Sequence, residues 1–477
     1  MPILTIYTDQ GKREIRFDGE PSLRDLLDQS GIRMNYPCGG RGICGKCRAE
    51  IITESGTDPT TTVRGIRRIC KEILKENTEI HLKREENTIA LGHVKAIPEH
   101  RFTGKAFAAA DIGTTTIVLN IYDGNDGKLL ASESSDNPQI TVSGDVAGRI
   151  TAAGYRGKEM TEMIRQTVCT LADQTHLREN IEQWIITGNT TMLYLFSGKN
   201  PSSLGIFPFH ADTLFDSEET FDGGKVYYPP CIHAYAGADT VCALLASGIT
   251  ESEGSSLLCD IGTNGEIVLW KKGKGFVTSV AAGPVLEGFG IRCGCRGIPG
   301  AVNHVTRTGN GLYITTIGHQ RASGICGSGI LDAVAAGLEQ GYIDAEGMMK
   351  EPMKIAEDVF LYPEDIRQVQ LAKAAVYAGI TRLLQVSGTE EKEIERMILC
   401  GGFGSEIRPV SAARIGLISE NMLSAAESSG NLALQGAAVL YREKERSRVR
   451  EITKKTTYIN LGGDKIFNQL FIRSMRF

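Results

Sequence analysis

Four cysteines near the N-terminus have the residue type and spacing of ligands for an iron–sulfur cluster. Cys38, Cys44 and Cys47 form C-x5-C-x2-C within the run YPCGGRGICGKC, and Cys70 follows in RRICK after 22 intervening residues. A 2Fe–2S cluster needs four thiolates, and three on one tight loop can wrap it while a distant fourth closes the site. Glycines within the run let backbone N–H groups point at the sulfurs, which stabilises the reduced cluster. The spacing therefore predicts a 2Fe–2S site. The glycines between the first and third cysteine are Gly39, Gly40, Gly42 and Gly45.

This cysteine spacing resembles that of ferredoxins of the adrenodoxin and putidaredoxin type, rather than the C-x4-C-x2-C of plant ferredoxins. The alternative is a zinc site made of the same four cysteines. Zinc knuckles usually pair two C-x2-C motifs, and only one is found here. The cluster is therefore the favoured interpretation.

A repeated tetrapeptide, Asp-Ile-Gly-Thr, predicts two phosphate-binding loops. It lies between two apolar strands in residues 106–122 (AFAAADIGTTTIVLNIY) and again in residues 256–270 (SLLCDIGTNGEIVLW). Aspartate can hold magnesium through water, glycine lets the backbone approach phosphate oxygens, and threonine donates hydrogen bonds to them. Two such loops facing each other would bind a polyphosphate from both sides. The first loop comprises Asp111, Gly113, Thr114 and Thr115; the second comprises Asp260, Gly262, Thr263 and Asn264.

A third glycine-rich segment, ERMILCGGFGSEI, predicts the place of the adenosine. An apolar strand there ends in Gly401, Gly402, Phe403 and Gly404. Glycines at a strand end let a flat adenosine lie against the backbone, and a helix N-terminus nearby favours phosphate. Alone, such a run more often marks a tight turn, but here it follows two phosphate loops in order.

These three motifs resemble the acetate and sugar kinase, heat-shock chaperone and actin superfamily over residues 107–445. The resemblance implies a duplicated α/β actin-like ATPase fold with two ribonuclease-H-like halves, and it implies ATP and Mg²⁺ as ligands. LQGAAVLY looks like the second connecting helix, in which Gly436 would permit close helix packing. Asp239 in AYAGADTVCALLASG resembles the acid residue of the N-acetylglucosamine kinase branch, with a helix N-cap aspartate as the alternative.

Two further segments carry weaker signals. GICGSGILDAV, at positions 324–334, looks like a glycine turn that enters a helix beside the nucleotide, although packing alone could demand it. Lys373 in QLAKAA could reach the nucleotide, but an exposed helical lysine is the favoured interpretation.

The elements that position these residues can be predicted from local patterns. Two strands around the turn Asp9-Gln10-Gly11, a helix from Leu23 to Gln29 capped by Ser22, and a strand from Arg48 to Thr53 predict a β-grasp 2Fe–2S domain. Strands that alternate with helices from Phe107 onward predict an α/β fold. The expected organisation is a ferredoxin domain (1–90), a linker (91–106), the two ATPase halves (107–253 and 254–445) and a C-terminal tail packed on the body (446–477).

Composition places the chain among soluble, cytoplasmic proteins. It has 477 residues, of which 41% are hydrophobic and 23% charged, and 52 basic residues stand against 57 acidic ones for a net charge of −5. This balance gives no reason to expect a nucleic-acid groove or an anionic membrane partner. The N-terminus has no signal-peptide pattern and no window holds 18 consecutive apolar residues, so we expect no membrane span. Without a secretory signal, metal or redox roles outrank disulfides for the 12 cysteines.

A one-electron carrier joined to an ATPase with two closing halves predicts electron transfer that nucleotide binding gates or drives. The whole arrangement resembles the reductive activators of corrinoid proteins, including GNTTM (188–192), AAGP (281–284) and the C-terminal INLGGDKIFNQLFIRSMRF. The resemblance implies ATP-dependent reduction of cobalt(II) to cobalt(I) on a partner corrinoid protein of a methyltransferase system. It also implies an upstream electron donor and a possible homodimer. Because the chain has no Asp-x-His-x-x-Gly cobalamin motif, the corrinoid must sit on the partner.

Other functions remain as alternatives at this point. The linker is short, without the separate middle domain that some of these activators carry, so the resemblance does not fix the partner. An activator of the 2-hydroxyacyl-CoA dehydratase type would hold a 4Fe–4S cluster through cysteines of the ATPase fold. Only Cys293 and Cys295 lie close together there, and their C-x-C spacing suits that site poorly. A redox-sensing ATP-binding regulator and a small-molecule kinase with an accessory ferredoxin are the remaining classes.

Overall fold

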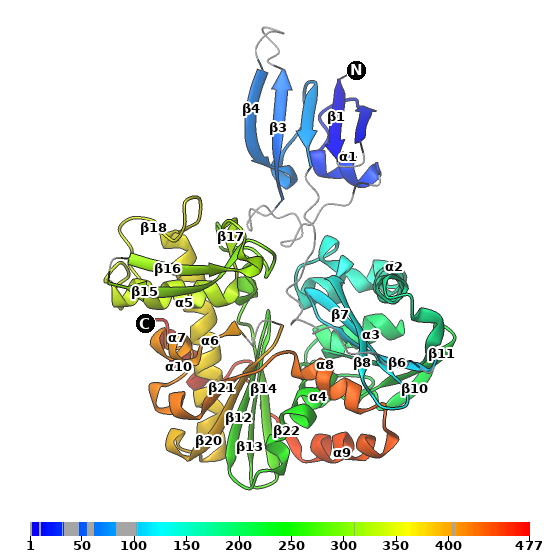
Figure 1. The fold of residues 1–477 in the computed structure, drawn as a ribbon, viewed down its shortest axis with the longest axis vertical. Helices are drawn as coiled ribbons and strands as arrows, with labels where there is room; N and C mark the ends of the chain where they lie inside the picture. Colours follow the sequence, from blue (N-terminus) through cyan, green and yellow to red (C-terminus); the bar gives the residue numbers. More distant parts are fainter. Residues whose placement is uncertain are drawn as a thin grey trace. The chain divides into compact units, whose positions relative to one another are not determined.

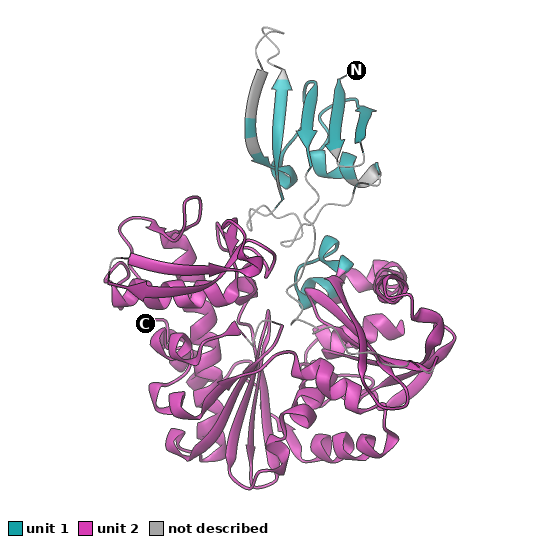
Figure 2. Cartoon of the chain, in the orientation of Figure 1, with its two compact units in different colours: residues 1–87, 138–149 teal, residues 88–137, 150–477 magenta. Residues whose placement is uncertain are grey.

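The computed structural model describes residues 2–8, 11–30, 32, 47–54, 62–82, 102, 104–309, 311–402 and 406–477. The chain forms two compact units, which Figure 2 shows in different colours. One comprises residues 1–87 and 138–149, and the other comprises residues 88–137 and 150–477. Most of the expected linker, 91–106, lies outside the described residues, which resume in full at residue 104.

The N-terminal unit contains a five-stranded mixed sheet with one helix against it. The strand order is β2-β1-β5-β3-β4; β1 and β5 are parallel, and the other neighbours are antiparallel. Side chains at every second position enter the core because successive residues of a strand face opposite sides; Leu4, Ile6 and Ile80 lie there against Leu23 and Leu27. The predicted strands and helix are confirmed. Their bounds are β1 (Ile3–Thr8), β2 (Gly11–Arg16), α1 (Leu23–Gln29), β3 (Arg48–Glu54), β4 (Thr62–Arg68) and β5 (Thr78–His81).

The larger unit is built on two six-stranded sheets that share the same arrangement of five strands, with the sixth strand added at a different edge of each (Figure 1). In each, three antiparallel strands are extended by two strands that run parallel to the first. This duplication confirms the predicted actin-like fold. The first sheet has β6 (Ala106–Ile112), β7 (Thr116–Asp123), β8 (Leu129–Asp136), β9 (Ile181–Gly188), β10 (Ser217–Phe221) and β11 (Gly224–Tyr228). The second has β12 (Ser255–Ile261), β13 (Gly265–Lys271), β14 (Lys274–Val280), β20 (Ile394–Cys400), β21 (Ala426–Ser428) and β22 (Thr456–Tyr458).

Two helices between the sheets explain the glycine in LQGAAVLY. Helix α8 (Leu432–Val439) packs against α4 (Ala238–Ser247), and a Cβ added to Gly436 would lie 1.9 Å from the carbonyl oxygen of Cys242. Only glycine permits this approach of two backbones. Residues of both sheets and both helices share one core, to which Phe107, Leu258 and Leu434 contribute. The two halves are thereby joined at their base.

The remaining helices flank the sheets, and a smaller layer extends the second half (Figure 1). In that layer, β15 (Ala301–Thr308) pairs with β16 (Gly311–Thr316) and β17 (Gly324–Ile325), and α5 (Gly327–Glu339) packs against it. A Cβ on Gly329 would lie 2.2 Å from the Val302 carbonyl oxygen, so packing accounts for the glycines of GICGSGILDAV. The other helices are α2 (Val146–Gln174), α3 (Thr190–Ser197), α6 (Pro363–Ser387), α7 (Pro409–Arg414), α9 (Glu443–Lys454) and α10 (Lys465–Arg473), and a two-stranded ribbon joins β18 (Met353–Lys354) to β19 (Phe360–Leu361).

The C-terminal segment is more than an appended tail. Strand β22 pairs in parallel with β14 and so completes the second sheet, while α10 packs on α6. The expectation of an exposed Lys373 is wrong: the side chain is buried, donates to the carbonyl oxygen of Arg476 and lies over the ring of Phe477. Burial lowers the pKa of Lys373 to about 8. This lysine therefore anchors the end of the chain, which the local pattern in QLAKAA could not indicate.

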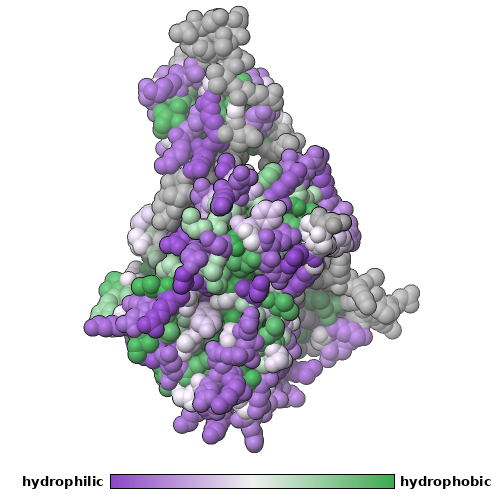
Figure 3. Space-filling model, turned by 90° about the vertical axis from the view of Figure 1, so that its left-hand side faces the viewer, coloured by the Kyte–Doolittle hydropathy of each residue, from purple (hydrophilic) through white to green (hydrophobic). Residues whose placement is uncertain are grey.

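Hydrophilic residues cover much of the face in Figure 3, with hydrophobic ones in small groups between them. Val410 and Ile472 are among the large hydrophobic residues that are exposed in the second half. Within the described parts of the chain, no helix is long and apolar enough to cross a membrane.

Candidate functional site

The structure brings the two predicted phosphate loops together. Loop one turns from β6 into β7, and loop two turns from β12 into β13. The hydroxyl oxygens of Thr115 and Thr263, one from each loop, lie 3.5 Å apart. Strands β6 and β12 are buried along their length except at Asp111 and Asp260, which occupy equivalent positions just before each turn. Duplicated strands thus place duplicated loops face to face across the two halves.

Three predicted aspartates converge at these loops. Burial raises the pKa of Asp111 to about 6, although its carboxylate accepts a hydrogen bond from the Asn431 amide at 2.7 Å. Burial, and then the charges of Asp239, Asp111 and Glu287, raise the pKa of Asp260 to about 8. Burial and the charge of Asp111 raise the pKa of Asp239 as well. Carboxyl groups so close together repel one another when ionised, and a cation among them would remove this repulsion.

Asp239 does not cap its helix. Gly237 is the N-cap residue of α4, and Asp239 lies in the first helical turn, where its Oδ1 accepts hydrogen bonds from the Thr240 N–H at 2.7 Å and from the Thr240 hydroxyl at 3.3 Å. The N-cap alternative is therefore wrong. The side chain instead lies close enough to Asp111 for the charge of that carboxylate to raise the pKa of Asp239.

The start of the predicted adenosine motif lies directly against loop two. Gly401 has a φ of +122°, and a Cβ there would lie 2.8 Å from Oδ1 of Asp260 and 2.5 Å from the carbonyl oxygen of Ile261. Both the backbone conformation and the space therefore require glycine. A Cβ on Gly402 would meet no atom within 4 Å. Phe403 and Gly404 lie outside the described residues.

Sequence reasoning missed three residues that hold this site. The Asn189 amide donates to the Thr114 hydroxyl at 3.1 Å, and Asn431 holds Asp111; each asparagine is also the N-cap of a helix, α3 and α8 respectively. Helix N-caps can be predicted from sequence, but the second contact of each asparagine arises only in the fold. Glu287 accepts hydrogen bonds from the Thr263 N–H at 2.6 Å and the Thr263 hydroxyl at 3.0 Å. It follows the singled-out AAGP segment, yet nothing in the sequence marks it.

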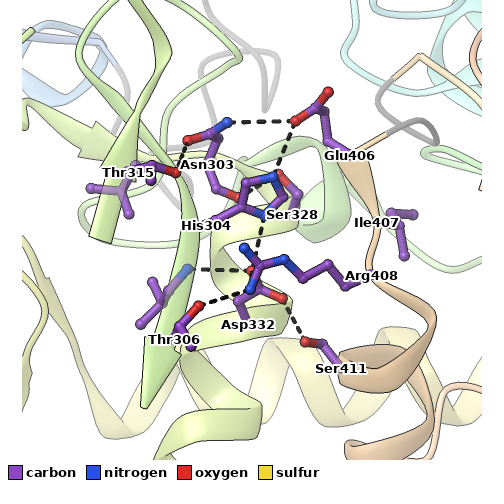
Figure 4. Close-up of polar contacts among 12 residues, drawn as sticks. Asn303, His304, Thr306, Thr315, Ser328, Asp332, Glu406, Ile407, Arg408 and Ser411 are labelled. Carbon is purple, nitrogen blue, oxygen red and sulfur yellow. Dashed lines mark hydrogen bonds and ion pairs between the residues drawn. The ribbon is translucent and has the colours of Figure 1, made fainter. Parts of the chain in front are cut away.

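An ion-pair network fixes the chain that follows the adenosine motif (Figure 4). His304 of β15 lies between two carboxylates, with Nδ1 3.0 Å from Asp332 and Nε2 3.3 Å from Glu406. Asp332, buried on α5, also accepts from the Ser411 hydroxyl at 2.5 Å and lies 3.5 Å from the Arg408 guanidinium. Glu406 and Arg408 follow the glycine run within a few residues, and the network ties residues 406–408 to the β15–α5 layer.

The ion pairs of His304 are expected to make the stability of the fold depend on pH. Hydrogen bonds to Asp332 and then Glu406 raise the pKa of His304 from 6.5 to about 9, while burial and Arg408 act against them. Because the folded state binds the proton more tightly than the unfolded chain, this stabilisation is complete below pH ~6.5 and is lost as the pH rises to ~9, on the order of 1–3 kcal/mol. We expect His304→Gln to lower the thermal midpoint at about pH 6 and to have little effect near pH 10.

The measurement is thermal unfolding of wild type and variant across this pH range. The exposed His210 provides the control, since His210→Gln removes a histidine outside the network. A difference between wild type and His304→Gln that does not change with pH would contradict the assigned charge state.

Two of the four predicted cluster ligands lie within the described residues, and they converge. The Sγ atoms of Cys47 and Cys70 are 3.1 Å apart, well beyond the ~2.05 Å of a disulfide. Cys47 is buried directly before β3, and Cys70 lies in the short helical turn Ile69–Lys71, whose first N–H donates to the Cys47 carbonyl oxygen. Two thiols that come from distant parts of the chain and are not joined by a disulfide fit a shared metal group. Cys38 and Cys44 lie outside the described residues.

Direct metal coordination elsewhere is not supported by the described side chains. Among the residues that the structure describes, no three His, Cys, Asp or Glu side chains are close enough to hold one metal ion. Magnesium held by Asp111 and Asp260 through water stays a prediction. Cys293 and Cys295 form backbone hydrogen bonds with Ile325 of β17. These bonds give the segment a structural role that needs no metal.

Comparison with known proteins agrees with both parts of the chain. Residues 254–477 match the family model described as the C-terminal domain of RACo, the ASKHA domain; residues 107–252 match the RACo middle region, and residues 7–71 match the 2Fe–2S iron–sulfur cluster binding domain. The family's middle region thus corresponds to the segment that we assigned to the first ATPase half.

Relatives and a solved structure extend over most of the chain. The corrinoid activation enzyme RamQ of Eubacterium limosum is 32% identical over 77% of this chain and 70% of its own. A reductase of Methanosarcina barkeri, named for a Co(II) methylated amine-specific corrinoid protein, is 25% identical over 76% of this chain and 75% of its own. A reductive activator for a corrinoid, iron–sulfur protein shares the fold, with a TM-score of 0.72 and 23% identity over 99% of this chain and 98% of its own. The chain therefore belongs to the RACo family of reductive activators of corrinoid proteins, with an N-terminal 2Fe–2S domain and an ASKHA-type ATPase domain.

Proposed function

We propose that this protein uses ATP to transfer one electron from its 2Fe–2S cluster to the cobalt of a partner corrinoid protein, converting cobalt(II) to cobalt(I). The observation that carries the proposal is the pair of facing phosphate loops, with Thr115 and Thr263 3.5 Å apart, in one chain with a 2Fe–2S domain. A simple electron carrier needs no ATP, and a sugar kinase needs no cluster. The combination is explained if nucleotide binding makes an unfavourable electron transfer possible.

The energy available from nucleotide binding is sufficient for this task. A ligand that favours one conformational state by about 10⁴-fold supplies roughly 5.5 kcal/mol. At about 59 mV per tenfold change for a single electron, this offsets roughly 240 mV of unfavourable potential. The acceptor is therefore a centre too reducing for an ordinary ferredoxin to reduce. The resemblance to the reductive activators of corrinoid proteins implies that this acceptor is cobalt(II) in a corrinoid protein.

The residues of the ATPase domain have distinct parts in this proposal. Asp111 and Asp260 hold Mg²⁺ through water molecules, and Asp239, beside Asp111, adds the third carboxylate. The phosphates accept hydrogen bonds from Thr114 and Thr115 of the first loop and from Thr263 and Asn264 of the second. The backbone can approach the phosphates at Gly113 and Gly262 because glycine has no side chain. The run from Gly401 to Gly404, with Gly402 and Phe403, receives the adenosine. When bound, magnesium supplies positive charge that neutralises the triphosphate.

The cluster domain provides the electron. Cys47 and Cys70, together with Cys38 and Cys44, hold the 2Fe–2S group, which supplies a one-electron reducing centre when bound. The partner is a corrinoid protein of a methyltransferase system, and a separate upstream donor reloads the chain with an electron. A homodimer is compatible with this scheme. One of the two relatives is named as a corrinoid activation enzyme and the other as a reductase of a corrinoid protein, which supports the class of partner.

Anaerobic absorption spectroscopy tests the proposal. The reduced protein is mixed with a cobalt(II) corrinoid protein, with and without MgATP, and the cobalt(I) spectrum is followed. We expect cobalt(I) to form only when ATP is present. Equal reduction without nucleotide, or purified protein without iron, would contradict the proposal. Nucleotide-dependent partner binding without cluster reoxidation would instead indicate a regulator, and a phosphorylated metabolite would indicate a kinase.

A further inference from the structure

Glu287 lies at the junction of the two phosphate loops. One of its oxygens, Oε1, accepts from both the N–H and the hydroxyl of Thr263 in loop two. That Thr263 hydroxyl lies 3.5 Å from the Thr115 hydroxyl of loop one. Through Thr263, the carboxylate of Glu287 is held at the point where the threonines of the two loops meet. It therefore lies where the two halves would close on the terminal phosphate of a bound nucleotide.

The chain holds this carboxylate in a fixed orientation. The AAGP segment returns to loop two, where the Gly283 N–H donates to the Thr263 carbonyl oxygen at 2.9 Å, and a helical turn, Pro284–Glu287, then leads to the carboxylate. Thr263 is thus bonded on both sides, through its carbonyl by Gly283 and through its N–H by Glu287. The turn ends at Gly288, whose φ is +79° and where a Cβ would lie 1.9 Å from the Cys295 carbonyl oxygen. The segment from AAGP to Gly288 thus holds the Glu287 side chain against loop two.

The second carboxylate oxygen is free to accept a proton. Oε2 of Glu287 is buried and has no hydrogen-bond partner among the described residues. A buried acceptor without a partner is costly, and one that faces a reaction site is a candidate for contact with substrate or water. Because Oε1 is fixed by Thr263, Oε2 points in a defined direction. A general base requires this combination of an orienting contact and a free acceptor.

We propose that Glu287 positions the water that attacks ATP and accepts its proton. The step forms a bond between the water oxygen and the γ-phosphorus, breaks the bond from that phosphorus to the oxygen of the leaving ADP, and transfers one proton from water to Glu287. The products are ADP and phosphate, and the proton then leaves to solvent. This inference rests on the proposed ATP site.

Two other roles for Glu287 make different predictions. As an internal substitute for phosphate on the Thr263 N–H, it would compete with nucleotide, so its removal would tighten binding. As a magnesium-binding group, its removal would raise the Mg²⁺ concentration needed for turnover. Asp239 is less suited to the role of base, because its described hydrogen bonds are to its own helix and its neighbour is Asp111, a proposed magnesium residue.

The test compares Glu287→Gln, which keeps the shape and removes the base, with wild type. We expect kcat for ATP hydrolysis to fall by about 10²–10⁴-fold. Binding of a non-hydrolysable ATP analogue and the Mg²⁺ requirement should change by less than about threefold. The matched variant is Glu266→Gln, which removes a carboxylate from the same buried region but has no hydrogen bond to either loop. We expect it to retain far more turnover than Glu287→Gln.

Several outcomes would overturn the inference. The first is that Glu287→Gln keeps its turnover, with or without tighter binding of the analogue. The second is that Glu287→Gln needs more Mg²⁺ but recovers its kcat at saturating Mg²⁺. The third is that Glu287→Gln and Glu266→Gln lose turnover equally. Loss of turnover in Asp239→Asn alone would assign the base to Asp239. The wild-type protein separates this inference from the proposed function: if it neither binds the analogue nor hydrolyses ATP, the ATP site itself is wrong. If it does both and Glu287→Gln does the same, only the role of Glu287 fails.

Discussion

Replacing Cys70 with alanine is expected to remove the visible spectrum of the 2Fe–2S cluster and all corrinoid reduction, while leaving nucleotide binding intact. Cys70 and Cys47 bring their sulfurs to within 3.1 Å of each other in a part of the chain that matches a cluster-binding domain. Alanine cannot donate a thiolate, and a 2Fe–2S cluster with three ligands is not held stably. Cys70 is only partly buried, so the substitution should leave the domain folded.

The measurements are iron content, visible absorption, cobalt(I) formation and binding of a non-hydrolysable ATP analogue. Cys293→Ala is the matched control, because it removes a partly buried thiol from the ATPase domain. It should retain the cluster and electron transfer. A loss of iron in Cys293→Ala, with iron retained in Cys70→Ala, would place the metal in the ATPase fold and favour the dehydratase-activator type.

The repeat explains why so much of the fold could be predicted from the sequence. A strand, a short turn and a second strand form a local unit, and their apolar residues and glycines are visible within a window of about fifteen residues. When the unit occurs twice, duplication of a known topology follows. The same holds for α1, where Ser22 and the residues after it mark a helix that the structure contains from Leu23 to Gln29.

Residues whose roles depend on distant parts of the chain could not be predicted in this way. Asn431 contacts Asp111 across 320 positions, and Thr115 contacts Thr263 across 148. The position of Lys373 on α6 indicated exposure only as long as the C-terminal segment was treated as an appendage. Once α10 packs on α6, Lys373 is buried beneath Phe477. Local propensity decides which element forms, whereas tertiary packing decides which of its faces is covered.

The cluster of half-buried carboxylates also bears on the balance between stability and function. Asp111, Asp239, Asp260 and Glu287 lie close enough for the charges of the other three to raise the pKa of Asp260. Like charges in a buried site destabilise the nucleotide-free fold, and a site selected only for stability would not keep them. Their cost is understandable if a cation and a nucleotide bind there. This leads to an expectation about stability as well as about activity.

Asp260→Asn is therefore expected to abolish ATP turnover and yet leave the protein as stable as wild type or more so. The amide has nearly the same shape but no charge, so it cannot orient the water shell of magnesium, and removing a transition-state electrostatic contact of this kind costs about 10²–10³-fold in kcat. It also removes the carboxylate that the charges of Asp239, Asp111 and Glu287 repel, as the raised pKa of Asp260 indicates. The cluster spectrum should be unchanged.

Steady-state ATP hydrolysis at varied Mg²⁺, thermal unfolding without nucleotide, and visible absorption distinguish this expectation from simple misfolding. Asp358→Asn is the control, since Asp358 is exposed and forms an ion pair only with Arg321 among the described contacts. It should match wild type in all three measurements. Unchanged turnover in Asp260→Asn would remove this residue from the site. A variant that loses turnover together with stability would show that Asp260 serves the fold. A stable variant without turnover would show that the charge of Asp260 serves nucleotide turnover and not the stability of the fold.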